Sequence, residues 1–556
     1  MLFGSLVRGH DGGGEAGPQL TPNAPAPPPL PPDGVVARVV LARPACIIGS
    51  PEQGSLSMAR DSYLASIRER LANETGRRDK HAPYRIALAY PSPYRMGMSS
   101  LGFLQIYKQI QEEPGMACER AFLPDEAPDA RRTSQAAEPV PLTYEGLRPL
   151  SDFPVIGLSV AYELELAGVI RLLEAAGIPA LREERDERHP FILCGGPLTF
   201  SNPLPLAPFA DAILMGEADT LVIDALRLLR ESRSREGACA ALALVPHIFV
   251  PSHHGVSLPP VAQCPNDLLP AWSPIRTPDT ELSNMFLIET ERGCSRGCTY
   301  CVMRRSTNGG MRLVSKERLL DLIPEDARRV GLVGAAVSDH PKIAEICRTL
   351  AARGAEVGLS SLRPDRLNDD FVGALKLAGY RTLTTAMDGA SERLREALER
   401  RARIRHLVKS AELARKHGMN RLKLYLMVGL PEETDADIDE CAAFVSELSR
   451  VIPVALGIAP FCAKRNTPLD GMPFAGIDVV NDRLDRLRRG LKGRADVRGT
   501  SARWAWVEYV LAQGGDAEGR AVRTAVHAGG TFSAYQRAFR ALAPTRPRRS
   551  LAIAPL

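Results

Sequence analysis

Three closely spaced cysteines are the residues best suited to chemistry in this chain. Cys294, Cys298 and Cys301 follow one another with three and then two residues between them. Thiolates at such short spacings can hold one soft metal centre, because a tight loop brings the sulfurs together. No fourth cysteine follows nearby, so a four-iron cluster bound here would keep one iron open to an exogenous ligand. The alternatives are three unrelated thiols or a zinc site, which would require a fourth protein ligand.

The elements around this loop predict a parallel barrel over residues 284–480. The apolar run 284–289 reads as a strand, with the cysteine loop at its carboxyl end. Active sites of parallel α/β barrels collect at that end of the strands. Later apolar runs end at 334, 361, 388 and 430, and we expect residues at those ends to face the same ligand.

A second series of alternating strands and helices precedes the barrel, over residues 81–235. Such alternation predicts a doubly wound, Rossmann-like parallel sheet. Ligands of these sheets bind beyond the carboxyl ends of the strands. Small or polar residues fall at those ends, namely Ser159, Gly195, Gly196, Gly216 and Glu217. The alternative is that the glycines only form tight turns.

The rest of the chain is divided by composition. Residues 1–80 are predicted to be a disordered Pro- and Gly-rich tail followed by a short helix. Residues 236–283 read as a Pro-rich linker, and residues 481–556 as a C-terminal helical region. The net charge of +5 over 556 residues does not indicate a nucleic-acid partner. No secretory leader or membrane span is apparent, and we expect a cytoplasmic protein.

The segment from Ile288 to Cys301 resembles the cluster loop of the radical SAM superfamily. The resemblance implies a partial (β/α)6 TIM-type barrel in which the three cysteines bind a [4Fe-4S] cluster. It also implies that the open iron binds S-adenosyl-L-methionine and that reductive cleavage yields a 5'-deoxyadenosyl radical. A low-potential electron donor such as flavodoxin or ferredoxin is then an expected partner.

The same resemblance implies a set of S-adenosylmethionine contacts. Gly334 stands where the family holds the ligand's amino group, although the usual Gly-Gly-Glu sequence is absent. Ser361 and Arg363 match a Ser-x-Arg strand end, and the alternative for Arg363 is a structural pair with Asp365. The remaining implied contacts are Tyr300, Asp388, Val428, Gly429 and Leu430, with Asp388 standing where a glutamate is usual.

The upstream sheet resembles the cobalamin-binding domain that precedes many radical SAM domains. The resemblance implies that the cofactor is lined by Ser159, Gly195, Gly196, Gly216 and Glu217 of this chain. One departure is clear: the loop Pro91-Ser-Pro-Tyr-Arg-Met-Gly97 lacks the histidine of the Asp-x-His-x-x-Gly motif.

The function expected from these features is reductive cleavage of S-adenosylmethionine, with cobalamin-dependent methylation of an unactivated carbon as one outcome. A methylthiotransferase is an alternative, but it needs three further cluster cysteines, and Cys46, Cys118 and Cys194 lie too far apart in unlike positions. The other alternative is a non-catalytic protein that binds cobalamin or a cluster.

Overall fold

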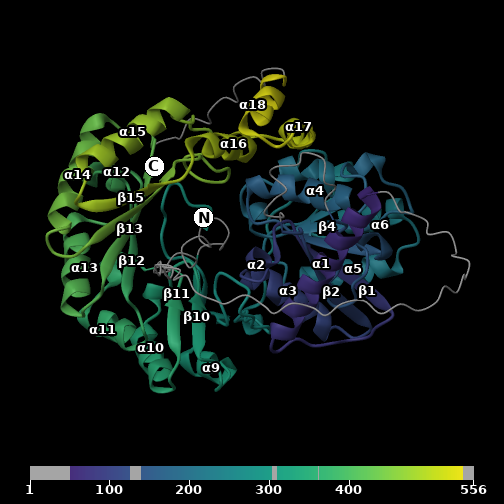
Figure 1. The fold of residues 1–556 in the computed structure, drawn as a ribbon, viewed down its shortest axis with the longest axis horizontal. Helices are drawn as coiled ribbons and strands as arrows, with labels where there is room; N and C mark the ends of the chain where they lie inside the picture. The colour runs from purple at the N-terminus through teal and green to yellow at the C-terminus, as the bar shows by residue number, and fades with distance from the viewer. Residues whose placement is uncertain (1–50, 126–138, 304–309, 361, 543–556) are drawn as a thin grey trace, which may run out of the picture.

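Two α/β units lie side by side and are bridged by the C-terminal helices (Figure 1). The computed structural model describes residues 51–125, 139–303, 310–360 and 362–542. The predicted tail up to residue 50 lies outside the described residues. The short helix predicted after this tail is α1, Pro51–Asn73.

The N-terminal unit is built on a six-stranded sheet of order β2-β1-β3-β4-β5-β6. The first five strands in that order run parallel, and β6 pairs antiparallel with β5. The predicted doubly wound sheet is therefore confirmed. Its strands are β1 Tyr84–Tyr90, β2 Met116–Phe122, β3 Val155–Ser159, β4 Phe191–Gly195, β5 Ala212–Leu214 and β6 Ile248–Phe249. Nearly every strand residue is buried, as continuous apolar runs covered on both faces require.

Helices cover both faces of this sheet. They are α2 Tyr94–Gly97, α3 Leu101–Glu112, α4 Leu166–Ala175, α5 Leu221–Glu231, α6 Arg235–Ala243 and α7 Pro251–His254. Three short 3-10 turns follow strand ends, η3 Glu163–Glu165, η5 Pro197–Phe200 and η6 Leu204–Phe209. The structure differs from the predicted linker at 236–283, because α6 and β6 lie within it and β6 extends the sheet.

The second unit is an open parallel barrel made of two sheets. One sheet has the order β11-β10-β7 and the other β12-β13-β14-β15, and all these pairs are parallel. The strands are β7 Phe286–Glu289, β10 Arg329–Val333, β11 Glu356–Leu359, β12 Thr382–Asp388, β13 Arg421–Val428, β14 Val454–Pro460 and β15 Ala495–Gly499. Six of them, β7 and β10 to β14, are the predicted (β/α)6 strands.

Helices surround the barrel and enclose a single apolar core. They are α9 Lys316–Leu322, α10 Ile343–Ala352, α11 Asp369–Leu377, α12 Glu392–Ala397, α13 Ile404–Lys416, α14 Asp435–Leu448 and α15 Ile477–Gly490. A small antiparallel hairpin, β8 Glu291–Gly293 and β9 Met311–Leu313, stands at the carboxyl end of β7.

The C-terminal region is mostly helical, as predicted, but it also contributes strand β15 to the barrel. Its helices are α16 Ala502–Gln513, α17 Asp516–His527 and α18 Phe532–Arg540. Side chains of these helices join the core of the N-terminal unit and contact α4 and η6. Figure 1 shows them, in yellow, spanning the two units. Among the described residues, no helix has the length and apolar character needed to cross a membrane.

Candidate active site

The cysteine loop leaves and re-enters the barrel through the β8–β9 hairpin. Gly293 ends β8, Met311 begins β9, and the two residues pair with each other. Gly293 has φ of 98°, a conformation that glycine adopts without strain, immediately before the first cysteine. Residues 304–309 of the loop lie outside the described residues. The hairpin thus holds both ends of the loop at the carboxyl end of β7, where the sequence placed it.

The three thiols fit a multi-iron cluster better than a single ion. All three are free, Cys298 is buried and the other two are partly buried. Burial raises the pKa of all three thiols, to about 11 for Cys301, and the neighbouring thiols add to the shift at Cys298 and Cys301. Among the described residues, the three sulfurs do not form a set within 4.8 Å of one another. Three thiolates can each bind one iron of a cluster and leave a fourth iron open, whereas a structural zinc ion needs a fourth protein ligand.

Arg400 is a charged neighbour of the cysteines that the sequence did not reveal. Its guanidinium pairs with Asp388, and both side chains are largely buried. Burial lowers the pKa of Arg400, but Asp388, Tyr300 and Cys298 together raise it further, so the net shift is upward. Asp388 ends β12 with φ of 63°, which turns the chain at the strand end. Two predicted ligand contacts, Asp388 and Tyr300, therefore lie together beside Cys298.

Arg363 is held by two aspartates. Its guanidinium donates to Asp365 at 3.1 Å and pairs closely with Asp339, and its side chain is 3% exposed. Asp339 also accepts a hydrogen bond from Ser295 at 3.1 Å, and Asp365 pairs with Arg296. This geometry favours the structural alternative for Arg363, because the aspartates link it to the cysteine loop. Ser361, predicted beside it, lies outside the described residues.

Glu291 occupies the space above Gly334, where the family's amino-group site is expected. A Cβ on Gly334 would lie 2.0 Å from the Glu291 carboxylate, so only glycine fits there. The carboxylate accepts the N–H of Ala336 at 2.8 Å and is 1% exposed. Burial raises the pKa of Glu291 to about 8. Sequence reasoning missed Glu291, because nothing in its spacing marks it as close to Gly334.

The implied S-adenosylmethionine contacts Val428, Gly429 and Leu430 lie at the end of β13. Val428 and Leu430 are buried, and Gly429 has φ of 77°. The N–H of Gly429 donates to the Glu433 carboxylate at 2.7 Å. The segment is thus a tight, apolar strand end at the same edge as Asp388, as expected. The main-chain N–H of Gly429 is already bonded to Glu433.

Four of the five residues predicted for cobalamin stand at the carboxyl ends of β3, β4 and β5. Ser159 pairs with Gly195 in the sheet. Gly196 has φ of 110°, and a Cβ there would lie 2.6 Å from the Val160 carbonyl oxygen. Gly216 has φ of 90°, and its Cβ would meet the backbone of Ala262 at 2.6 Å. Close backbone approach therefore explains these two glycines without a ligand, as the alternative proposed.

The carboxyl ends of the two sheets face each other across the domain boundary. Lys464, in the loop after β14, donates to Glu163 of η3 at 2.7 Å and to Glu508 of α16 at 2.8 Å. Asn466 in the same loop donates to the carbonyl of Ser201, after β4, at 2.9 Å. Strand ends of the N-terminal sheet thus meet strand ends of the barrel.

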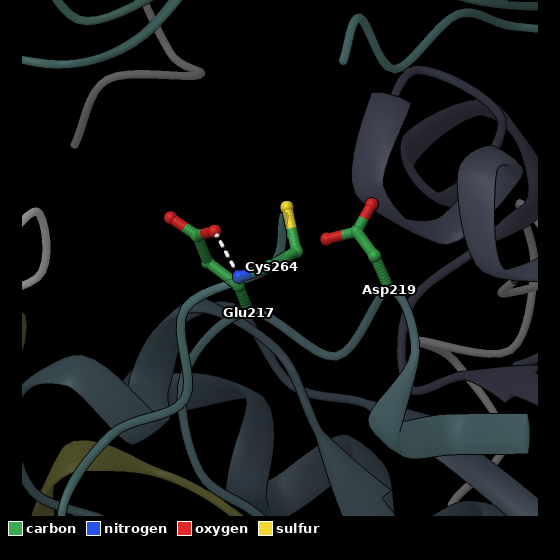
Figure 2. Close-up of side chains that lie close together, drawn as sticks. All are labelled: Glu217, Asp219 and Cys264. Atoms are coloured by element: carbon green, nitrogen blue, oxygen red, sulfur yellow. Dashed lines mark hydrogen bonds between the residues drawn. The ribbon is translucent and has the colours of Figure 1, made fainter. Parts of the chain in front are cut away.

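The fifth residue, Glu217, points to the cysteine hairpin. Figure 2 shows it with Asp219 and Cys264, whose ligand atoms all lie within 4.8 Å of one another. A terminal nitrogen of Arg292 lies 3.3, 2.8 and 3.0 Å from Glu217, Asp219 and the Cys264 sulfur. Burial raises the pKa of Cys264 to about 12, which keeps the thiol protonated. The guanidinium already supplies the cation at the centre of this set, so the set does not form a metal site.

Comparison with known proteins gives two family matches. Residues 102–251 match the family of radical SAM proteins, N-terminal, and residues 288–445 match the radical SAM superfamily. An uncharacterized protein of Methanocaldococcus jannaschii is 26% identical over 401 residues, which are 70% of this chain and 80% of that protein. The ribosomal protein uS12 methylthiotransferase RimO of Geotalea uraniireducens is 26% identical over 224 residues, 36% of this chain and 47% of that enzyme.

Among solved structures, the cobalamin-dependent S-adenosylmethionine radical enzyme OxsB with aqua-cobalamin bound is similar with a TM-score of 0.46 and 14% identity. The similarity covers 74% of this chain, which spans 58% of OxsB. The two family matches together extend over more than half of the 556 residues. With those matches in this order, and with the three-cysteine loop at the carboxyl end of the first strand of a parallel barrel, the chain belongs to the radical SAM superfamily.

Proposed function

We propose that this protein is a radical SAM enzyme that methylates an unactivated carbon with the help of cobalamin. Membership of the superfamily implies a [4Fe-4S] cluster on Cys294, Cys298 and Cys301, with S-adenosylmethionine as its ligand. When bound, the cluster supplies the electron that cleaves the sulfonium bond. The methylation step is our inference. It rests on one observation, that the strand ends of a doubly wound sheet face the strand ends of the barrel.

The residues of this chain would hold the reactants between those two edges. Buried Val428 and Leu430 make the end of β13 apolar, which suits a neighbouring flat purine. Asp388 with Arg400 and Tyr300 provides polar groups next to Cys298. Across the boundary, Ser159 and Gly195 end neighbouring strands of the N-terminal sheet and would hold cobalamin, which would supply the methyl group.

Absorbance spectroscopy of the anaerobically purified full chain tests this proposal, because the cluster and cobalamin absorb differently. After reconstitution with iron, sulfide and hydroxocobalamin, we expect both cofactors to remain through gel filtration. Methyl-labelled S-adenosylmethionine and reductant should then transfer label to the bound corrin. A protein that retains the cluster and excludes cobalamin would eliminate the methylation while leaving the radical chemistry in place.

The methylthiotransferase alternative is not favoured by the positions of the other cysteines. Cys118 lies in β2 and Cys194 in β4, and burial raises the pKa of each thiol. Buried thiols of this kind are inert. Cys46 lies outside the described residues.

A low-potential electron donor, flavodoxin or ferredoxin in type, remains the proposed partner. The support is a surface cavity of about 520 Å³ next to the cysteine loop, whose lining mixes arginines (Arg296, Arg401, Arg403, Arg405) with carboxylates (Glu392, Glu396, Glu399). The carbonyl of Glu399 in the same wall lies 4.0 Å from the Cys298 sulfur. A donor protein seated at this cavity would lie close to Cys298, with both arginines and carboxylates available for charged contacts. An oxygen-sensitive cluster would also favour a reducing, cytoplasmic setting.

A further inference from the structure

The β8–β9 hairpin carries an arginine on each strand, directly opposite one another. Arg292 on β8 pairs in register with Arg312 on β9. Arg292 lies two residues before Cys294, and Arg312 follows the end of the cysteine loop. Both guanidiniums donate to the same carboxylate, that of Glu217 in the N-terminal unit. One side chain of the other domain therefore contacts both ends of the loop that carries the cysteines.

Glu217 is itself held firmly. It follows β5, its N–H donates to the carbonyl of Ala262 at 3.1 Å, and its carboxylate accepts the N–H of Cys264 at 2.9 Å. Arg312 also donates to the carbonyl of Cys264 at 2.8 Å. The side chains of Glu217 and Arg312 are only 6% and 10% exposed. In such a dry setting a charged hydrogen bond is strong, and removing one partner leaves an unpaired buried charge.

Other contacts complete the charge balance around this carboxylate. Arg292 donates to Glu289 through two bonds of 2.7 and 2.8 Å and to Asp219 at 2.8 Å. The cysteine loop also has anchors in the barrel, among them Asp339, Asp365 and Leu398. Glu217 and Asp219 of the N-terminal unit both contact Arg292, and Glu217 also contacts Arg312 on the opposite strand of the hairpin.

We propose that Glu217 is a positioning residue, through which the N-terminal domain fixes the cysteine loop and hence the geometry of the cluster. The inference rests on the proposed function of the cysteines as cluster ligands. Because Arg292 and Arg312 flank the cysteine loop, a movement of Glu217 shifts both ends of the loop together. The N-terminal domain is then required for a correctly held cluster, and its role is wider than that of a second cofactor site.

The test compares Glu217→Gln with Glu174→Gln in the reconstituted full chain. Glutamine keeps the size of residue 217 and removes its charge. Glu174 lies in α4 and likewise contacts a distant part of the chain, since it accepts from Arg523 at 3.0 Å and from His527 at 2.8 Å, both on α17. It therefore controls for a general loss of contact between the N-terminal unit and the C-terminal helices.

Three measurements distinguish positioning from simple loss of stability. We expect Glu217→Gln to release iron to a chelator on the order of 10-fold faster, as loss of outer partners of metal ligands commonly does. At matched iron content, the EPR spectrum of the reduced cluster with S-adenosylmethionine should change shape and the KM for S-adenosylmethionine should rise. Glu174→Gln should leave all three at the values of the unaltered protein. Equal behaviour of the two variants, or an unchanged Glu217→Gln protein, would overturn the proposal.

Arg312→Gln provides an independent route if Glu217→Gln does not fold. It removes the same contact from the hairpin side and should reproduce the faster iron release. The double variant should add little to either single change, because coupled partners are not additive. Normal iron release by Arg312→Gln would contradict the proposal. If the unaltered protein holds its cluster but fails to cleave S-adenosylmethionine, the proposed function fails, while the iron-release comparison still decides the role of Glu217.

Discussion

The side chains of Asp388 and Arg400 form a buried ion pair beside Cys298. The resemblance identified Asp388, but Arg400 lies beyond the next helix, and no local pattern links it to the cysteines. Pairing sets the orientation of Asp388 and brings a positive charge to the cluster ligand. Residues of this kind are found only when the chain is folded, because their contacts join distant parts of the sequence.

Replacing Arg400 should change the redox potential of the cluster. A nearby positive charge stabilises the reduced, more negative form, so Arg400→Gln is expected to lower the midpoint potential by tens of millivolts. A one-electron couple changes its equilibrium constant tenfold for about 59 mV. EPR-monitored redox titration measures this shift. Arg488→Gln, an exposed arginine on α15 paired with Asp485, is the control and should leave the potential unchanged. A potential that is equal or higher in Arg400→Gln would contradict the argument.

Glu165 should give the protein a measurable pH dependence. Burial raises its pKa to about 7, although it accepts the N–H of Ala161 at 2.6 Å. The unfolded chain releases this proton near pH 4.5, while the folded chain keeps it until about pH 7. Stability should therefore fall as pH rises between those values, by roughly 3 kcal/mol at most.

Urea unfolding of the unaltered protein and Glu165→Gln at pH 5, 6, 7 and 8 tests this expectation. The variant should gain stability relative to the unaltered protein as pH rises to 7, and the difference should level off above it. A difference that stays constant across the series would show that Glu165 does not titrate in this range.

At the scale of elements, the order of strands was predictable and their pairing partners were less so. The apolar run 284–289 predicted β7, because buried parallel strands need continuous apolar sequence. The strand β15 was missed, since Ala495–Gly499 is polar and largely exposed at the edge of its sheet. The packing of α16 to α18 on the N-terminal unit was also not predicted, because an amphipathic helix does not specify its partner.

Asn202 fastens this C-terminal packing. Its buried amide donates to the carbonyls of Leu511, Ala512 and Gly514 at 3.2, 3.0 and 2.9 Å, which satisfies the end of α16. Asn202→Ala leaves these carbonyls without that donor and should cost about 1–3 kcal/mol. Hydrogen exchange in α16 to α18 should become faster. Asn73→Ala, which loses one exposed contact of 3.4 Å, is the control. Exchange unchanged in Asn202→Ala would show that apolar packing alone holds these helices.

For the whole molecule, the principal result is that two parallel sheets present their carboxyl ends to each other. Strand–helix alternation predicted the N-terminal sheet, and the resemblance to the radical SAM superfamily implied the barrel and the strand ends that would carry function. The sequence could not predict that Lys464 would meet Glu163, or that Glu217 would reach the cysteine hairpin. Such contacts form only when the two domains dock. No local pattern in the sequence marks which residues will meet at the domain boundary.

Cleavage of S-adenosylmethionine by the anaerobically reconstituted protein tests the central claim most directly. With a chemical reductant, the unaltered protein should form 5'-deoxyadenosine and methionine in equal amounts, as measured by chromatography. Cys298→Ala, which removes one of the three cluster ligands, should form at most background amounts. Cys347→Ala, a change at a buried cysteine in α10 of the barrel, is the matched control and should retain cleavage. Equal product from the unaltered protein and Cys298→Ala would contradict the account.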